Sequence, residues 1–361
     1  MKVPFNALTP GEDAADIKAA VERVVASGWF VLGPEVEAFE SEFAAASRVP
    51  HAVGVGNGTD AIFLILRALD IGKGDEVITS PLSAAFSALA IMMSGARPVF
   101  ADIDGERLTL DPRATEAAIT SRTRAIMPVH LYGQAADMEA FEAIASRHGL
   151  ALVEDAAQAQ LATAAGRPVG SVGIAAATSF YPTKNLGALG DGGAVLTRDE
   201  GLASRVKRLR NGGQARRYHH EEAGVNTRLD ELQAAILRAK LRFLPSWTAR
   251  RRTIAARFRS ALISGSVLVP RECDPGHVYH LFPVLTGHRD RFQTHMAAAG
   301  VETLIHYPLP LTRQPSLAPA SPAVCPVADR VCSEVVSLPM YPALREDQVV
   351  AVADGAATFR P

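Results

Sequence analysis

The sequence has few cysteines, and their spacing does not favour pairing. Cys273, Cys325 and Cys332 are the three cysteines among 361 residues, and no two of them have the C-x-x-C spacing. An odd and scattered set argues against a disulfide framework and against a zinc site, so we expect no bound metal. Because free thiols persist in reducing compartments, the sequence predicts a cytoplasmic protein.

Long apolar runs and an excess of one charge are also missing. No stretch approaches the ~18 apolar residues that a membrane span needs, and the N-terminus turns acidic at Glu12 and Asp13 without the apolar segment of a signal peptide. A net charge of -1 leaves no broad basic field for nucleic acid or an anionic membrane. We therefore expect no export, no membrane insertion and no nucleic-acid partner, and we interpret the arginines at 250–252 as a solvated helix face.

The pattern of the chain indicates an α/β fold with a substantial core. Hydrophobic residues make up 48% of the sequence, and from residue 51 to about 200 short apolar runs alternate with helical patterns. This alternation is typical of repeated βαβ units on a mostly parallel sheet. The sequence predicts strands at 51–56, 76–79, 98–101, 125–129, 151–154, 175–179 and 193–196, with helices at 61–69, 112–119 and 138–147.

Further helices are expected on both sides of this block, at 13–27, 35–46, 230–244 and 248–262. Pro245 is expected to end the helix at 230–244, because proline cannot continue a helix. Beyond these helices, proline and glycine separate shorter predicted elements. We therefore predict a large domain at 1–245 and a smaller C-terminal α+β domain at 246–361.

The connector at 28–34 has the sequence Gly-Trp-Phe-Val-Leu-Gly-Pro. Such an apolar, aromatic segment is unusual on a plain surface. It could be buried by the core of the same chain or by a partner subunit, and both interpretations stay open.

Lysine is scarce in this chain, and one lysine has a distinctive position. There are 31 arginines and 6 lysines, and Lys184 is the only lysine between Lys73 and Lys207, a stretch with nine arginines. Arginine is therefore the usual cation here, yet it cannot lose a proton and attack a carbonyl as a primary amine can. A solvated loop lysine is the ordinary interpretation, and the surrounding motifs decide against it.

A glycine-rich turn, Gly54-Val-Gly-Asn-Gly58-Thr59, lies between a predicted strand and a predicted helix. This arrangement aims backbone N–H groups and the positive helix end at a phosphate, although tight turns also use glycine for conformation alone. The dinucleotide fingerprint G-x-G-x-x-G fails because Thr59 stands where its last glycine is required, and no Walker P-loop occurs. The failed dinucleotide fingerprint counts against a nicotinamide dehydrogenase.

Polar residues follow the ends of two other predicted strands. Asp155 and Gln158 follow one strand, and Ser179 closes another, five residues before Lys184. Ligands in open α/β sheets bind beyond the carboxyl ends of strands, so these side chains and the glycine-rich turn would share one crevice. A lone aspartate here could simply cap a helix. The combination instead matches what pyridoxal 5'-phosphate (PLP) needs: phosphate ligands, a carboxylate for the pyridine nitrogen and an amine for the aldehyde carbon.

Several long motifs in this sequence are specific. They are Glu154-Asp-Ala-Ala-Gln158, Ser179-Phe-Tyr-Pro-Thr-Lys-Asn-Leu-Gly187, Gly190-Asp-Gly-Gly193 and Asn226-Thr-Arg-Leu-Asp-Glu-Leu-Gln-Ala-Ala235. Together they resemble the DegT/DnrJ/EryC1/StrS family of sugar aminotransferases. The similarity begins at residues 28–37, includes Gly56-Asn-Gly-Thr59, and ends at Ser337-Leu-Pro-Met340, so it covers nearly the whole chain.

The resemblance implies a fold of the aspartate-aminotransferase type (PLP fold type I) and a homodimer with shared active sites. By similarity, Lys184 would hold PLP covalently, Asp155 would pair with the pyridine nitrogen, and Gln158 would lie beside the ring hydroxyl. The phosphate would be held by Gly58, Thr59 and Ser179, together with the partner subunit's Asn226.

The same resemblance implies amino transfer, usually from L-glutamate, to a keto sugar linked to a nucleotide (dTDP, UDP or GDP). Relatives that dehydrate their substrate characteristically have histidine in place of the lysine, so Lys184 favours transamination. Two alternatives stay open: an aminotransferase of a keto-cyclitol, and an inactive regulator that kept the cofactor fold.

The chain departs from the family at the residue expected to stack on the cofactor ring. Ala84 occupies the position where relatives often have an aromatic, and Phe86 either replaces it or belongs to the core. Three further residues, Tyr218, His219 and His220, form either a substrate contact or an ordinary solvated loop. His306 lies in a segment that resembles one near the family's active site, but it could equally be structural.

Overall fold

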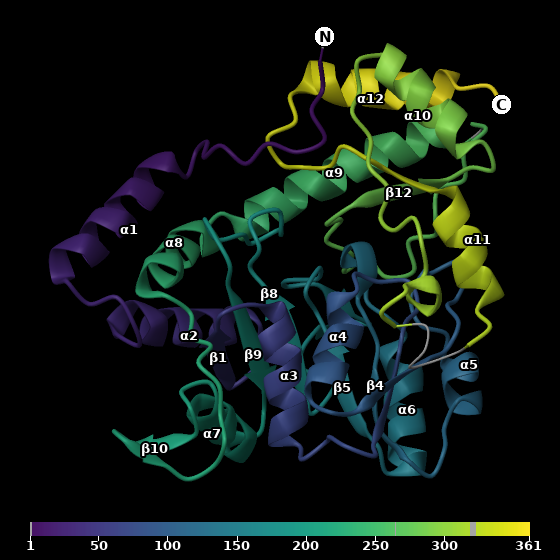
Figure 1. The fold of residues 1–361 in the computed structure, drawn as a ribbon. Helices are drawn as coiled ribbons and strands as arrows, with labels where there is room; N and C mark the ends of the chain where they lie inside the picture. The colour runs from purple at the N-terminus through teal and green to yellow at the C-terminus, as the bar shows by residue number, and fades with distance from the viewer. Residues whose placement is uncertain (1, 264, 318–322) are drawn as a thin grey trace.

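The computed structural model describes residues 2–263, 265–317 and 323–361, and within them seven strands form one central sheet (Figure 1). Only β9 runs antiparallel to its two neighbours, and the other strands are parallel to one another. The predicted α/β fold with a mostly parallel sheet is therefore confirmed. In spatial order the strands are β1 (His51–Val55), β9 (Gly193–Thr197), β8 (Ala175–Ser179), β5 (Ala151–Asp155), β4 (Thr123–Met127), β2 (Glu76–Thr79) and β3 (Arg97–Phe100).

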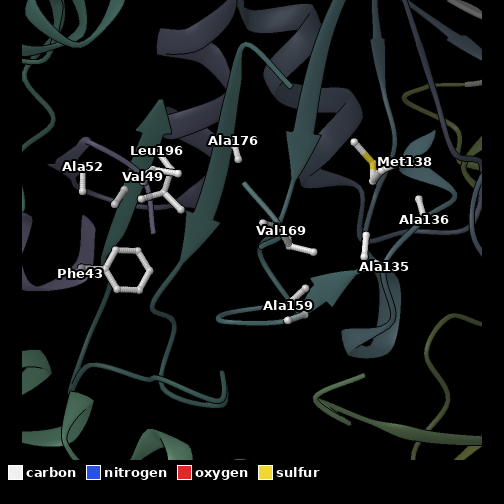
Figure 2. Packing of buried hydrophobic residues seen from close by; sticks show 14 of the residues in the cluster. Phe43, Val49, Ala52, Ala135, Ala136, Met138, Ala159, Val169, Ala176 and Leu196 are labelled. Atoms are coloured by element: carbon white, nitrogen blue, oxygen red, sulfur yellow. The ribbon is translucent and has the colours of Figure 1, made fainter. Parts of the chain in front are cut away.

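Both faces of the sheet are buried, because successive side chains of a strand point to opposite sides. In β8, Ala175 and Ala177 pack on one side and Ala176 on the other. Figure 2 shows the second side, where Ala176 lies in the same cluster as Phe43. The first side is covered by α3 (Gly58–Ala68), α4 (Phe86–Met93) and α7 (Glu200–Leu209), and the second by α2 (Pro34–Ala46), α6 (Met138–His148), α8 (Glu231–Leu241) and, in part, α5 (Pro112–Ala117).

A second core lies in the C-terminal part of the chain. The long helix α9 (Leu244–Leu262) packs with a two-stranded antiparallel sheet and two helices, which Figure 1 shows above the large sheet. The N-terminal residue Val3 belongs to this second core. The other elements of this core are β12 (Phe282–Leu285), α10 (Arg289–Ala298), β13 (Val335–Leu338) and α12 (Glu346–Thr358). Helix α11 (Pro326–Glu334) lies nearby.

Short elements complete the described structure. None of its helices is long and apolar enough to cross a membrane. Besides α1 (Ala14–Ser27), the remaining elements are β6 (Thr163–Ala164), β7 (Arg167–Pro168), β10 (Gln214–Arg216), β11 (His219–His220) and the 3-10 turns η1 (Leu131–Gly133) and η2 (Leu311–Arg313).

The predicted strands are all present, and two, β2 and β8, have the predicted bounds. The main errors concern helices. The helix expected at 230–244 ends at Leu241, and Pro245 lies in the first turn of α9 instead of ending a helix. Proline suits that place because it lacks the N–H that a first turn leaves unpaired anyway. Helices α4 and α7 were not predicted. The predicted domain boundary at 245 falls at the start of α9 and stays a prediction.

The arginines at 250–252 do not form a uniform solvated face, so that interpretation was wrong. Arg252 is exposed, but Arg251 is buried, and its Nη1 donates to the backbone oxygens of Tyr279, His280 and Met340. Its burial depends on contacts with segments that are distant in the sequence.

The aromatic connector at 28–34 is not buried by its own chain. Trp29 is 57% exposed and Phe30 is 48% exposed, which rules out burial in the core. The carboxylate of Glu231 holds the connector in place, because it accepts N–H groups from Gly33, Glu35 and Val36 and so caps the start of α2.

Strand β5 places two consecutive carboxylates on opposite sides of the sheet. Glu154 accepts N–H groups from Gly170, Val172 and Gly173 and hydrogen-bonds His130 at 2.9 Å. The Nδ1 atom of His130 accepts the Ala136 N–H, so its Nε2 carries the proton that it donates to Glu154. Burial alone would raise the pKa of Glu154, but these hydrogen bonds outweigh burial and lower it. The Glu154 carboxylate thus has a structural role. The Asp155 carboxylate lies on the opposite side of the sheet.

Candidate active site

The predicted site residues meet at one edge of the sheet. β5 ends at Asp155, β8 ends at Ser179, and the turn after β1 leads into α3 at Gly58. These three strands run in the same direction, so their carboxyl ends lie at the same edge, where ligands bind in open α/β sheets.

The glycine-rich turn presents free backbone N–H groups beside Ser179. The Asn57 side chain accepts the Asp60 N–H, and the first intrahelical bond of α3 runs from Ala61 to Asn57. The amides of Gly58 and Thr59 precede that bond and point out of the helix start, which is a favourable place for an anion. A Cβ atom on Gly58 would lie 2.9 Å from Cβ of Ser179, so only glycine allows this close approach.

Asp155 is buried and is held in one orientation by two hydrogen bonds. Its Oδ2 accepts the Ser87 hydroxyl at 2.6 Å, and its Oδ1 accepts the Ala157 N–H at 3.1 Å. Ser87 lies in the first turn of α4, next to Phe86. Ser87 was not identified as a site residue from the sequence. It directly follows Phe86, which had been considered as a cofactor contact, and this position could have pointed to it.

Lys184 lies in the turn that follows β8, where its N–H bonds the Tyr181 oxygen at 2.8 Å. Burial lowers the pKa of its amine from 10.5 to about 8, and the Asp155 carboxylate opposes this shift. An amine with this pKa is partly neutral near physiological pH, as a nucleophile or a proton acceptor requires.

The lowered pKa of Lys184 predicts how covalent attachment of PLP to the apoprotein depends on pH. Only the neutral amine attacks an aldehyde, so the attachment rate should rise about tenfold per pH unit below pH 8 and level off above it. Stopped-flow absorbance after mixing with PLP would measure this. A rate that keeps rising toward pH 10, as for an ordinary lysine, would contradict the assignment.

Gln158 is buried and connects two tyrosines. Its Oε1 accepts the Tyr132 N–H at 2.8 Å, and its Nε2 donates to the Tyr307 hydroxyl at 3.2 Å. Burial raises the pKa of Tyr307 to about 12, and the nearby Asp155 adds to the shift, so this phenol stays protonated. Tyr307 is therefore a site residue that the sequence did not single out by itself.

Two histidines, His280 and His306, lie near Lys184. Burial and then the charge of Lys184 lower the pKa of His306 to about 4, and burial lowers the pKa of His280 well below its usual value, with Lys184, Arg251 and His306 adding to the effect. Both rings are therefore neutral at pH 7. His306 also hydrogen-bonds Ser337 at 3.0 Å, so it has a structural contact while lying near Lys184.

The remaining predicted residues lie outside this group. Asn226 is exposed, although its neighbour Thr227 accepts the Gly56 N–H and donates to Asp60 beside the glycine-rich turn. Phe86 is 63% exposed, so the suggestion that it belongs to the core was wrong. Tyr218, His219 and His220 are exposed around the β10–β11 hairpin.

Comparison with known proteins identifies the class to which this fold and site belong. Residues 12–356 match the DegT/DnrJ/EryC1/StrS aminotransferase family, and the chain belongs to that family. The crystal structure of S. venezuelae DesV in complex with a ketimine intermediate is similar over 100% of both chains, with a TM-score of 0.97 and 46% identity. The expected PLP fold type I is thereby confirmed.

Two curated relatives are similar over nearly their whole length. The erythromycin biosynthesis sensory transduction protein EryC1 of Saccharopolyspora erythraea is 50% identical, over 99% of this chain and 100% of its own. The dTDP-3-amino-3,4,6-trideoxy-alpha-D-glucose transaminase of Streptomyces venezuelae is 47% identical, over 98% of this chain and 95% of its own.

Proposed function

We propose that this protein is a PLP-dependent aminotransferase that moves an amino group from L-glutamate to a keto sugar linked to dTDP, UDP or GDP. The observation that carries the proposal is the position of Lys184. Its amine, with a lowered pKa, lies close enough to the buried Asp155 carboxylate to be affected by its charge. Both lie at the same sheet edge as the anion-binding turn.

The residues present fit the cofactor. The amides of Gly58 and Thr59 and the Ser179 hydroxyl would bind the phosphate, and the absence of a Cβ on Gly58 makes room for that arrangement. Asp155 would pair with the pyridine nitrogen, and Ser87 orients the carboxylate for that role. Gln158 would lie beside the ring.

When bound, PLP supplies an electron sink that stabilises the charge left when the donor loses its α-proton. The Asp155 carboxylate would keep the pyridine nitrogen protonated, which strengthens that sink. The Nζ atom of Lys184 would accept the α-proton of the donor and later release it. A pKa of about 8 suits an amine that must both take up and release a proton near neutral pH.

The relatives support a nucleotide-linked sugar as the acceptor, because the S. venezuelae relative is named for a dTDP-linked amino sugar. A keto-cyclitol is the alternative acceptor. The name of the EryC1 relative points instead to signalling, which matches the regulator alternative. Lys184, Asp155 and the anion-binding turn are all retained in one arrangement, and this favours an active enzyme.

The proposal can be tested with the purified protein and two substrates added in turn. Wild-type protein loaded with PLP should absorb visible light, lose that band on adding L-glutamate, and regain it when a keto sugar nucleotide is added. Protein that stays colourless and cannot be reconstituted with PLP would sink the proposal. A keto-cyclitol that restores the band where sugar nucleotides do not would select the alternative acceptor.

We also propose a cytoplasmic homodimer in which each active site uses both subunits. The exposed Trp29 and Phe30 form an apolar surface that a second copy would cover. The cysteines of the chain are free, in keeping with a reducing compartment. Asn226 is exposed and directly precedes Thr227, the contact residue of the glycine-rich turn, which supports a role for it in a neighbouring subunit's site.

The shared site predicts complementation between two inactive variants. A hybrid dimer of Lys184→Ala and Asn226→Ala chains would contain one site with both residues intact. About half of randomly reassociated dimers are hybrids, so the mixture should recover about a quarter of wild-type activity. The assay is run at limiting PLP, where Asn226→Ala alone is poorly loaded. No recovery beyond the separate variants would show that Asn226 acts within its own subunit.

A further inference from the structure

A cavity of about 500 Å³ extends from Lys184 toward the second core. Its walls come from the loop after β8, the start of α9, the N-terminal segment 6–13 and the segment that contains Tyr341. It thus connects the reactive amine to residues that have no assigned function.

Arg251 of α9 lines this cavity and is 5% exposed. Its Nη1 donates to the backbone oxygens of Tyr279 (3.0 Å), His280 (3.3 Å) and Met340 (2.7 Å). Its Nε is buried without a hydrogen-bond partner, and no carboxylate of the described residues pairs with it. Burial lowers the pKa of this guanidinium to about 9, so it remains charged at pH 7. A buried cation without an acid is costly and is best explained by an anion that arrives with a ligand.

The other charged groups around the cavity leave Arg251 available. Lys240 donates to the Gly187 oxygen, and Arg250 pairs with Glu346 at 3.5 Å. On the acidic side, Glu12 accepts the Trp247 indole N–H at 2.6 Å, and Asp13 accepts the Gly11 N–H at 2.9 Å. His280, which lies near both Lys184 and Arg251, is neutral at pH 7. Arg251 is therefore a cation that lines the same cavity as the reactive amine, and no carboxylate of the described residues forms an ion pair with it.

We propose that Arg251 binds an oxyanion of a substrate in this cavity, which Lys184 also lines. The inference rests on the proposed function, which supplies two candidate oxyanions: the α-carboxylate of the amino donor and the diphosphate of the sugar nucleotide. The α-carboxylate is attached to the carbon whose amino group reacts, so it must lie near Lys184. The diphosphate is separated from the keto carbon by part of the sugar ring and would need the length of the cavity.

The test uses PLP-loaded protein and measures each half-reaction separately by absorbance. Arg251→Gln should raise the apparent dissociation constant roughly 10- to 100-fold for the substrate whose oxyanion it binds, because a hydrogen bond to a charged group is lost. If the variant binds glutamate more weakly, the oxyanion bound by Arg251 is the α-carboxylate of the donor. If it binds the sugar nucleotide more weakly, the oxyanion is the diphosphate. Arg251→Lys should restore part of the loss. The matched control is Arg252→Gln, whose arginine is exposed on the same helix and bonds the His277 oxygen.

A purely structural role for Arg251 would give a different result. Loss of the three backbone contacts would shift the visible band and weaken both half-reactions equally, and that outcome would overturn the proposal. Variants that match wild type in both half-reactions would overturn it as well, while the proposed function would stand. If the wild-type protein showed neither half-reaction, the proposed function itself would be wrong, and the proposal for Arg251 would fall with it.

A second pair of variants tests the cavity even if Arg251→Gln does not fold. Ala343 lines the cavity and is exposed, so its side chain can be changed without disturbing the contacts of Arg251. Ala343→Glu adds a negative charge there, whereas Ala343→Gln adds the same bulk without charge. The glutamate variant should bind the anionic substrate roughly three- to tenfold more weakly at low salt, and the difference should shrink at high salt. Equal affinities for the pair would contradict an oxyanion in this cavity.

Discussion

Lys184→Ala is expected to reduce amino transfer by roughly 10⁴-fold or more, because one substitution removes both the covalent attachment point and the proton-transfer group. The turn itself should survive, since the hydrogen bond between Lys184 and Tyr181 uses backbone atoms only. PLP would still bind through the amides at the start of α3, but without a covalent bond. Its absorbance should then resemble free PLP, and stopped-flow mixing with L-glutamate would measure the lost rate.

Lys184→Arg is the matched control for charge. It keeps a cation facing Asp155, but a guanidinium cannot act as the nucleophile or release a proton near pH 7. The arginine variant should therefore be as inactive as the alanine variant. Substantial activity in either one would show that another amine performs the chemistry and would remove the central support for the proposed function.

Asp155→Asn is expected to give the second largest loss, roughly 10³-fold in the rate of the first half-reaction. The amide has the same shape and can keep the Ser87 contact, but it carries no charge to hold the pyridine nitrogen protonated. Rapid-mixing absorbance with saturating L-glutamate would measure this rate, and cofactor content would be checked in the same sample.

Ser87→Ala separates the charge of Asp155 from its orientation. It removes the 2.6 Å hydrogen bond while the carboxylate stays in place. A loss of less than about tenfold is expected, since a single hydrogen bond between neighbouring side chains is removed. If Asp155→Asn lost no more than Ser87→Ala, Asp155 would be a structural residue and its pairing with the pyridine nitrogen would be wrong.

The fold was predictable because its signals are local. Buried strands such as β2 and β8 appear in the sequence as short apolar runs, and the structure gives them the predicted bounds. The site residues were found for a similar reason: the sheet brings together whatever follows the carboxyl ends of parallel strands, as with Asp155 and Ser179.

Residues fixed by distant contacts were not predictable in this way. Arg251 is one of three consecutive arginines, and only the backbone oxygens of distant segments, such as Tyr279 and Met340, make it a buried cation. Glu231 lies within a recognised motif, yet its role as a cap for α2 depends on a helix almost 200 residues earlier in the chain. Pro245 was misread because proline both ends and begins helices, and packing decides between them.

The adjacent carboxylates of β5 make this strand intolerant of any change in length. Glu154 requires three backbone N–H groups and His130 on one side of the sheet, and Asp155 requires Ser87 on the other. An insertion or deletion of one residue would exchange the two sides and leave both acids without their partners. The partners of Glu154 and those of Asp155 therefore each fix the register of β5. Evolution could lengthen the loops around this strand far more readily than the strand itself.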